Sequence, residues 1–537
     1  MDLTFVATIE GMHKQVLGTT LVIALLAASC SAGGAQHASP PPPPVSRPNI
    51  VFVLADDLDL TSFADAARFP RFHDLMTAHG TTFTNYFVTD SLCCPSRASI
   101  LRGQYVHNHG VEGNLPPGGG FEHWQQLRRD QSTVATWLHD SGYRTALLGK
   151  YLNGYPNTVA PTYVPPGWDE WASPSGGNPY AEYNYQLNEN GTLRHYGSDP
   201  GSYLVDVLAK KSRDFIAAQH GAQPFFMYVA PYVPHQPATP APRYANAFAG
   251  VRAPRTPSFD QADLSAEPAW LRNRPPLGPA VTTYIDQLYR RRLQSMLGVE
   301  DLLQTIVDAL RRTGKLDNTY IVFTSDNGFH LGQHRLPPGK QTAFEEDIHV
   351  PLVVRGPDVA AGRQDDSLAR EIDLAPTFAA LAHAKAAPFV DGVSLVPALV
   401  GNAHAGSGPR DVLIEHYAGT GTRQARTSVA VNEPDNDANP PTTGAPANGP
   451  AAPLRVPRRR VAVAIPTYRA LRTDRYLYVE YTTGERQLFD IAADPNELHN
   501  IVTTTDPVRV RTLARRLVSL VSCAAATCRN EPATGSG

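Results

Sequence analysis

The run Ile50-Val51-Phe52-Val53-Leu54, which stops at Asp56-Asp57, indicates the architecture of this chain. Five apolar residues follow one another without the polar alternation of a strand that has one face in water. An unbroken apolar run of this length is typical of a strand buried on both faces, as in parallel sheets covered by helices. The sequence therefore predicts a central strand here, with two acids at its carboxyl end.

Further strands and helices alternate along the chain. Apolar runs predict strands at residues 145–148, 225–230, 319–324 and 350–354. A helix is expected over residues 132–141, and the amphipathic pattern of residues 284–313 predicts one long helix or two. Because such alternation is typical of α/β proteins, we expect a large mixed but mostly parallel sheet sandwiched by helices over residues 47–415.

The character of the chain changes near its C-terminus, where we expect a smaller subdomain over residues 416–530. Residues 428–457 are rich in Pro, Ala, Asn and Gly and are predicted to be a disordered loop. Residues 459–491 alternate in polarity and predict an antiparallel meander, and residues 507–521 predict a final amphipathic helix. This subdomain is therefore expected to be α+β, built on an antiparallel sheet.

The N-terminal residues 1–30 have the pattern of an export leader. Residues 17–28 are mostly apolar, too short to span a membrane, and end in Ala27-Ala28-Ser29-Cys30. Cys30 after small residues resembles a bacterial lipobox, which predicts a lipid anchor, and an ordinary cleaved signal is the alternative. Residues 31–46 form a Pro-rich linker. We therefore expect an exported protein, either a cell-envelope lipoprotein or a secreted one.

Charge and cysteine content narrow the classes of function. Lys and Arg number 47 against 50 Asp and Glu in 537 residues, so the chain lacks the basic bias of a nucleic-acid binder. The arginine runs at residues 290–292 and 458–460 are interpreted as solvated surface. Cys523 and Cys528 are expected to form a small disulfide loop in an exported chain.

Several residues suited to chemistry stand just beyond predicted strand ends. They are Asp56, Asp57, Lys150, His235, Asp326 and Asn327. Ligands of open α/β sheets bind outside the carboxyl ends of the strands, so these groups are expected to converge on one edge. An acid pair after a strand is more often a turn or a helix cap. Two such pairs on one edge, Asp56-Asp57 and Asp326-Asn327, together with the cysteine motif that begins at Cys93, favour a site for a hard divalent cation, Ca²⁺ or Mg²⁺.

The segment Cys93-Cys94-Pro95-Ser96-Arg97, followed by Ala98-Ser99-Ile100-Leu101-Arg102-Gly103, is the most specific motif in the chain. It resembles the signature of the sulfatase family, within the alkaline phosphatase superfamily, and the resemblance extends from Arg47 to about Asn500. Residues 149–155, 163–168, 325–333 and 350–357 are most similar to the branch of N-acetylglucosamine-6-sulfatases and extracellular heparan 6-O-endosulfatases. Leu152, where many arylsulfatases have His, agrees with this branch.

The resemblance implies an alkaline-phosphatase-like fold and a particular set of site residues. Cys93 would be oxidised to formylglycine by a formylglycine-generating enzyme during maturation. A metal, Ca²⁺ by the family's pattern with Mg²⁺ as the alternative, would be held by Asp56, Asp57, Asp326, Asn327 and the modified Cys93.

The chemistry of a sulfate monoester agrees with these residue types. Its charge must be neutralised during attack on sulfur, and a metal with Arg97, Lys150 and Lys340 would do this. His235 would protonate the leaving oxygen. The hydrated aldehyde offers a second hydroxyl, which can expel sulfate after the first has attacked. Each residue also has a plainer interpretation: a helix-surface arginine, a strand-end lysine, a loop histidine or a loop lysine.

The sequence thus predicts an exported sulfuric ester hydrolase. The expected substrate is a 6-O-sulfated N-acetylglucosamine or a related sulfated glycan. One alternative is a phosphate or phosphonate monoester hydrolase of the same superfamily, and another is a catalytically inactive glycan-binding lipoprotein in which Cys93 is never converted.

Overall fold

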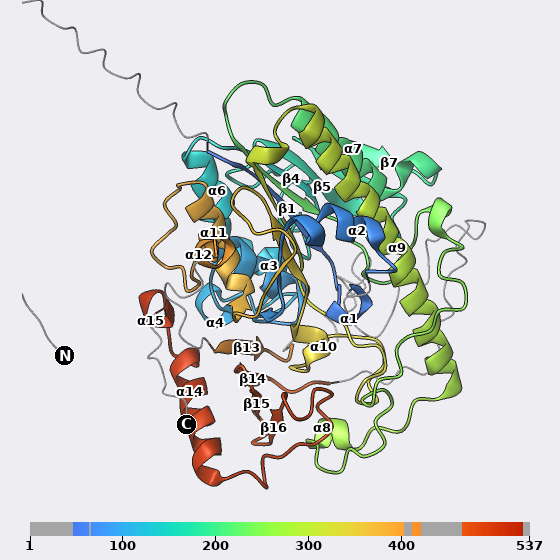
Figure 1. The fold of residues 1–537 in the computed structure, drawn as a ribbon, viewed down its shortest axis with the longest axis vertical. Coiled ribbons are helices and arrows are strands. Elements are labelled where there is room, and N and C mark those ends of the chain that lie inside the picture. Colours follow the sequence, from blue (N-terminus) through green and yellow to red (C-terminus); the bar gives the residue numbers. More distant parts are fainter. Residues whose placement is uncertain (1–46, 64–65, 402–410, 420–463, 530–537) are drawn as a thin grey trace, which may run out of the picture. The chain divides into compact units, whose positions relative to one another are not determined.

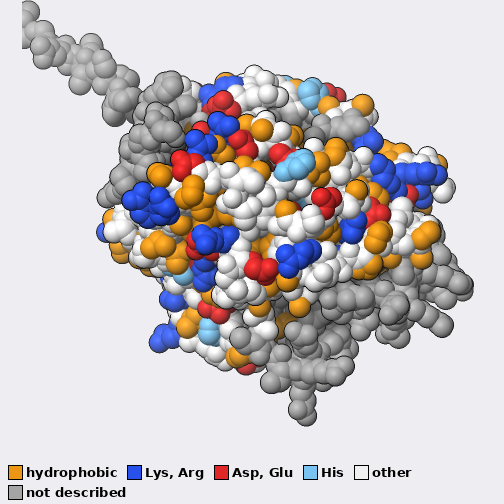
Figure 2. Space-filling view, turned by 90° about the horizontal axis from the view of Figure 1, so that it is seen from below, with side chains coloured by type: hydrophobic (Ala, Val, Ile, Leu, Met, Phe, Trp, Pro, Cys, Tyr) orange, Lys and Arg blue, Asp and Glu red, His pale blue; other side chains and the backbone are white. Residues whose placement is uncertain are grey.

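The computed structural model describes residues 47–63, 66–401, 411–419 and 464–529. The predicted leader, the Pro-rich linker, the loop at 428–457 and the arginine run at 458–460 lie outside these residues. Within the described part of the chain, none of the helices combines the length and the apolar character needed to cross a bilayer. Lys/Arg and Asp/Glu side chains are interspersed on the face drawn in Figure 2, in keeping with the balanced composition.

A ten-stranded mixed sheet forms the centre of the larger part (Figure 1). From one edge to the other its strands are β11 (Arg363–Asp365), β2 (Thr81–Phe83), β10 (Leu352–Arg355), β9 (Thr319–Ser325), β1 (Asn49–Ala55), β8 (Phe225–Ala230), β4 (Arg144–Gly149), β5 (Glu170–Gly177), β6 (Tyr185–Glu189) and β7 (Thr192–Tyr196). A two-stranded sheet pairs β3 (Tyr86–Phe87) with β12 (Ala369–Arg370).

Strand β1 lies at the centre of a parallel block, as its sequence predicts. It pairs in parallel with β8 on one side and β9 on the other, and β4 and β5 continue the block beyond β8. Strand β10 is antiparallel to both β9 and β2, so the sheet is mixed. The predicted α/β class with a mostly parallel sheet is therefore confirmed.

Helices cover both faces of this sheet (Figure 1). The α-helices of the described residues, on either sheet, are α1 (Leu60–Phe63), α2 (Pro70–Leu75), α3 (Cys93–Arg102), α4 (Val106–His109), α5 (Gly120–Gln126), α6 (Val134–Asp140), α7 (Leu204–Ala217), α8 (Ala269–Arg272), α9 (Pro279–Arg312), α10 (Glu345–Ile348), α11 (Leu374–Leu381), α12 (Val396–Leu399), α14 (Pro507–Val521) and α15 (Ala526–Arg529).

The side chains of β1 alternate between two apolar cores. Ile50, Phe52 and Leu54 join the core beneath α3, α5, α6 and α11, whereas Val51 and Val53 join the core beneath α1, α2, α7 and α9. Burial on both faces explains why the sequence of this strand lacks polar alternation.

The long helix α9 decides one expectation that the sequence left open and corrects another. It is one continuous helix of 34 residues rather than two. Arg292, predicted to lie on the solvated surface, is 1% exposed. Helical spacing from Leu288 to Arg292 and on to Val299 places this arginine on the apolar face of α9, because residues three or four apart share one face.

A four-stranded antiparallel sheet carries the C-terminal part. Its order is β13 (Val412–His416), β14 (Tyr468–Arg472), β15 (Tyr476–Tyr481) and β16 (Arg486–Asp490). Helix α14 packs on this sheet through residues such as Leu513 and Leu517. Cys523 and Cys528 form the predicted disulfide.

Candidate active site

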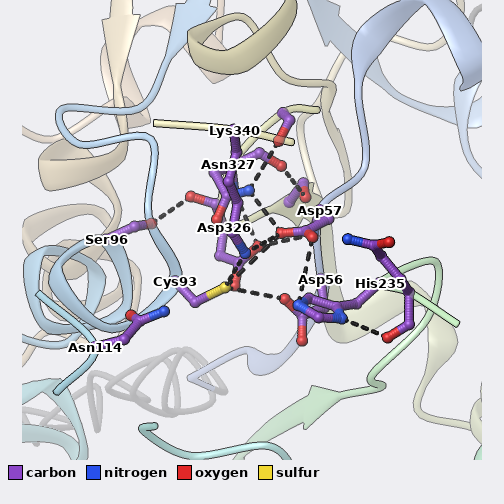
Figure 3. A network of polar contacts seen from close by, with 12 residues as sticks. Asp56, Asp57, Cys93, Ser96, Asn114, His235, Asp326, Asn327 and Lys340 are labelled. Carbon is purple, nitrogen blue, oxygen red and sulfur yellow. Dashed lines mark hydrogen bonds and ion pairs between the residues drawn. The ribbon is translucent and has the colours of Figure 1, made fainter. Parts of the chain in front are cut away.

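The acidic groups lie where the parallel strands end, on loops that follow β1 and β9 (Figure 3). Because β1 and β9 pair in register from Asn49 with Thr319 to Ala55 with Ser325, Asp56 and Asp326 emerge side by side. The backbone N–H of Asp326 donates to the carbonyl of Ala55 at 3.2 Å. Parallel pairing thus brings together acids that are 270 positions apart in the sequence (326 against 56).

Asp57 adopts an unusual backbone conformation that turns its carboxylate into the site. Its φ of 66° is in the left-handed region, which residues other than glycine seldom occupy. The Asp57 N–H donates to Oδ1 of Asp326 at 3.0 Å, and Nδ2 of Asn327 donates to Oδ1 of Asp57 at 2.7 Å. These hydrogen bonds hold the three side chains in one fixed group.

Cys93 is the first residue of α3. Its Sγ is 3.4 Å from Oδ1 of Asp56 and 3.8 Å from Oδ1 of Asp57. The next N–H, that of Cys94, donates to Oδ1 of Asn114 at 2.8 Å. Asn114 therefore caps the helix from outside it, and the thiol at its N-terminus faces the acids (Figure 3).

Two lysines and an arginine bind the same acids. Lys340 Nζ lies 2.7 Å from Oδ1 of Asp57 and 2.8 Å from Sγ of Cys93. Lys150 Nζ lies 2.8 Å from Oδ2 of Asp56.

Arg97 contacts the acids from the second turn of α3. Its Nε and Nη2 each lie 2.8 Å from Oδ2 of Asp326, and its Nη1 donates to the carbonyl of Lys150 at 3.1 Å. With the two lysines it gives three cations against the three carboxylates of Asp56, Asp57 and Asp326. All six side chains are buried, so their charges balance inside the protein.

This environment shifts the pKa values of several of these groups, Asp56 and Cys93 among them. Burial alone would raise the pKa of Asp56, but the positive charges of Lys150, His235 and Arg97 outweigh it, and the pKa lies below its usual value. Burial raises the pKa of the Cys93 thiol well above its usual value, and the nearby lysines only partly oppose this. An unmodified Cys93 is therefore a neutral thiol at neutral pH.

The donor set fits a hard divalent cation. Oδ2 of Asp57 and Oδ1 of Asn327 are both buried and accept no hydrogen bond. The amide nitrogen of Asn327 donates to Asp57 and to the carbonyl of Gly328, which fixes the amide next to Asp57. Unused carboxylate and amide oxygens are costly when buried and are the ligands that Ca²⁺ and Mg²⁺ prefer.

His235 closes the other side of the group of acids. Its Nδ1 lies 2.7 Å from the carbonyl oxygen of Gln236, which can only accept, so Nδ1 carries a hydrogen. Its Nε2 lies 3.5 Å from Oδ2 of Asp57. The ring therefore presents Nε2 to the site, in a position from which it can exchange a proton with a bound group.

A cavity of 380 Å³ opens beside this group. Lys150 forms part of its wall together with Asn153, Tyr180 and Tyr232. Further lining comes from Ser173, Ser175 and Asn157, so hydroxyl and amide groups dominate. Lys150 thus connects the buried acids to a polar space of a size suited to a small ligand.

The structure brings every predicted site residue into this one group, and it adds residues that the sequence did not reveal. Arg292 Nη2 donates to the carbonyl of Asp57 at 2.6 Å and pairs with Asp59 at 2.8 Å. Its Nη1 donates to the carbonyl of Pro234 at 3.2 Å, beside His235. Arg292 therefore fixes two of the loops that carry site residues, and its place on the apolar face of α9 was the available signal.

Ser96 and Glu371 support helix α3, which carries Cys93. Ser96 Oγ lies 2.6 Å from Oε2 of Glu371 and also contacts the carbonyl of Asp326. A hydroxyl has one hydrogen, so one of these two contacts requires a proton from the partner. Burial raises the pKa of Glu371 to about 8, which makes the glutamic acid the partner that supplies it at neutral pH.

Comparison with known proteins gives one consistent family. A model of the sulfatase family matches residues 48–384 of this chain. The N-acetylglucosamine-6-sulfatases of goat (Capra hircus) and human are 36% and 35% identical to it over 497 and 490 residues, or 90% of this chain and 85% and 86% of the relatives. A solved structure of a protein in complex with its substrate D-glucosamine-2-N,6-O-disulfate shares the fold, with a TM-score of 0.67 and 22% identity over 91% of this chain and 100% of that chain.

Proposed function

This chain belongs to the sulfatase family, and from that membership we propose that it hydrolyses the 6-sulfate ester of N-acetylglucosamine or of a related sulfated glycan. The choice of sugar depends on the goat and human relatives, which are N-acetylglucosamine-6-sulfatases and align over most of this chain. The hydroxyl- and amide-lined cavity beside Lys150 supports a sugar as the group carried by the ester.

The observation that carries the proposed chemistry is the position of Cys93. Its Sγ lies between Asp56 and Lys340, at the N-terminus of α3 and fully buried. We propose that formylglycine replaces this cysteine in the mature enzyme. The hydrated aldehyde would supply the oxygen that attacks sulfur.

A divalent cation completes the proposed site. Asp56, Asp57, Asp326 and Asn327 would hold it; their oxygen ligands suit Ca²⁺ and Mg²⁺ alike, and the family's pattern favours Ca²⁺. When bound, such an ion polarises sulfate oxygens and lowers the pKa of a coordinated hydroxyl. Because three carboxylates already balance three cations, an added dication gives the site a positive charge, which an anionic ester complements.

The remaining residues have distinct proposed roles. Lys340 and Lys150 would bind the non-bridging sulfate oxygens, and His235 would give a proton to the leaving sugar oxygen from Nε2. Arg97 would hold Asp326 and the Lys150 backbone in place, since both sides of its guanidinium are engaged by them.

We also propose that the chain is exported. The apolar leader and the Cys523–Cys528 disulfide support this, because disulfides persist in oxidising compartments. A lipid on Cys30 is the proposed anchor to the membrane. Replacement of Cys30 by Ala should release the protein from the membrane fraction, and the variant's staying with the membrane would contradict the anchor.

A panel of esters tests the proposed reaction. The 6-sulfate of N-acetylglucosamine should release sulfate faster than the 3- and 4-sulfates and faster than the matched 6-phosphate releases phosphate. A large preference for phosphate would identify a phosphate monoester hydrolase instead. Mass spectrometry of the peptide across Leu92 to Arg97 should find it lighter than the cysteine form. An intact thiol in active protein would overturn the proposed nucleophile.

A further inference from the structure

A second group of metal-ligating side chains lies where the large sheet's loops meet the small sheet. His334 follows β9, Glu346 is on α10, and Glu497 is on the loop after β16. Their nearest ligand atoms all lie within 4.8 Å of one another, and Nε2 of His334 is 3.8 Å from Oε2 of Glu346. Figure 1 shows α10 beside the small sheet.

Each of the three residues directs an unused atom into this group. Nε2 of His334, Oε2 of Glu346 and Oε1 of Glu497 are all buried and have no hydrogen-bond partner. His334 is 0% exposed and Glu497 is 1% exposed. Buried polar atoms normally find a partner, so three such atoms facing one space indicate a ligand.

The other atoms of these side chains are already engaged, which fixes their orientation. Oε1 of Glu346 accepts from Ser258 Oγ at 3.3 Å, and Oε2 of Glu497 accepts from the N–H of Glu345 at 3.0 Å. The His334 ring also stacks on Phe344, with the ring centres 3.8 Å apart. None of the three can turn its unused atom elsewhere without losing a contact.

Gln261 determines which nitrogen of His334 carries the hydrogen. Its Nε2 donates to the carbonyls of Asp263 and Leu498, so its Oε1 must be the atom 2.8 Å from Nδ1 of His334. Because that oxygen only accepts, Nδ1 of His334 is the donor. A neutral ring then has a lone pair on Nε2, the form in which histidine binds metals.

The cation nearest to this group is engaged elsewhere. Arg472, the nearby cation, is paired with Glu345 at 2.6 Å. Among the described residues, no lysine or arginine forms an ion pair with Glu346 or Glu497. The two buried acids therefore have no lysine or arginine as a partner, and a bound cation could neutralise them in place of a proton.

We propose that His334, Glu346 and Glu497 bind a divalent transition-metal ion, with Zn²⁺ as the ion to test. Two ligands about 2.1 Å from one ion lie about 3–4 Å apart, close to the separations here. One imidazole and two carboxylates suit Zn²⁺ or Mn²⁺, whereas Ca²⁺ prefers oxygen ligands alone. The ion would join the small sheet to the segment from His334 to Glu346, which carries Lys340 in its middle.

Metal analysis of the full-length protein tests this site separately from the active site. In an Asp326→Asn background, which weakens the first site, Zn²⁺-equilibrated protein should retain one zinc per chain. Adding Glu497→Gln, which mimics a protonated acid and keeps its contact with Glu345, should reduce this to none. Retention of that zinc in the double variant would overturn the proposal.

Two matched changes separate metal binding from general effects of charge and folding. Glu267→Gln removes another buried carboxylate at the same interface, bonded to Gln487, and should keep the zinc. Gln261→Leu should weaken zinc affinity about 10–100-fold, because the residue orients the ligating ring. Loss of zinc in Glu267→Gln, or unchanged affinity in Gln261→Leu, would contradict a ligand role for these atoms.

A crystal of the wild-type protein provides a readout that needs no variant. After equilibration with Zn²⁺, an anomalous-scattering peak at the zinc edge is expected between the three ligand atoms. A water molecule at that position, with no anomalous signal, would overturn the proposal. This measurement also decides the matter if Glu497→Gln fails to fold.

Discussion

The carboxyl edge of the central sheet and the interface around α10 both bury acidic side chains, but they balance the charge differently. At the sheet edge three carboxylates meet two lysines and an arginine. At the interface two carboxylates meet a neutral imidazole. A cluster that has its own cations is neutralised by the chain itself, whereas a cluster without lysine or arginine depends on a proton or on a bound cation.

The largest effect is expected at the sheet edge, from a pair of adjacent cysteines. Cys93→Ala should lower kcat/KM by about 10⁴-fold or more, because it removes the proposed nucleophile, and sulfate release from the 6-sulfated sugar measures it. Cys94→Ala is the matched control, since Cys94 belongs to the apolar core. Substantial sulfatase activity in Cys93→Ala would place the nucleophile elsewhere.

Replacing Arg292, which supports the loops at the sheet edge, should change the stability of the protein more than its catalytic rate. Arg292→Met leaves Asp59 buried without its partner and should lower the free energy of unfolding by about 3–5 kcal/mol in denaturant titrations. Arg290→Met, its half-buried neighbour on α9, should change stability by less than about 1 kcal/mol. Equal effects of the two changes would show that Arg292 does not fix the site loops.

Lys340→Met tests whether the cations of the edge act on the ester. It should lower kcat by about 10²–10³-fold, as loss of one group that stabilises transition-state charge does. Lys211→Met, at the partly exposed pair with Glu189, should leave kcat unchanged. An increase in KM alone for Lys340→Met would assign the lysine to substrate binding only.

The small sheet should respond to pH through a buried histidine. Burial, with a smaller contribution from Arg469, lowers the pKa of His416 to about 4, while the unfolded chain keeps the ordinary value of 6.5. Between these values the unfolded state binds more protons, so stability falls as pH falls from 6.5 to 4, by about 3 kcal/mol in all.

The variant His416→Phe should flatten that part of the stability profile while keeping the ring contact with Tyr468. Chemical denaturation at a series of pH values measures the slope, and the exposed His220→Gln serves as control. The same slope in His416→Phe as in the wild type would assign the pH dependence to other groups.

Local patterns in the sequence were sufficient to predict many of the strands of the fold. The apolar run of β1 reflects burial on both faces, and the strands β4, β8 and β9 agree with their apolar runs to within one residue at each end. The direction of a strand could not be predicted in this way, because the antiparallel pairing of β10 depends on where the chain enters the sheet. The path of the chain into the sheet is not encoded in any short stretch of sequence.

The candidate site was predicted as far as its residues belong to a motif or follow a strand. The family is confirmed, and the predicted residues meet at one edge. Asn114 and Glu371 were not predicted. Each reaches the site only in the folded chain and belongs to no recognisable sequence motif. His334, Glu346 and Glu497 come from three separate segments, so only the folded chain reveals them as a group.

The placement of β1 between β8 and β9 has a consequence for biogenesis. A ribosome adding 5–20 residues per second needs about 15–50 s to extend the chain from the end of β1 to the start of β9. Until then Asp326 and Lys340 do not exist to cover Cys93, which ends up fully enclosed. An enzyme that modified this thiol would therefore have to act on the chain before it has folded.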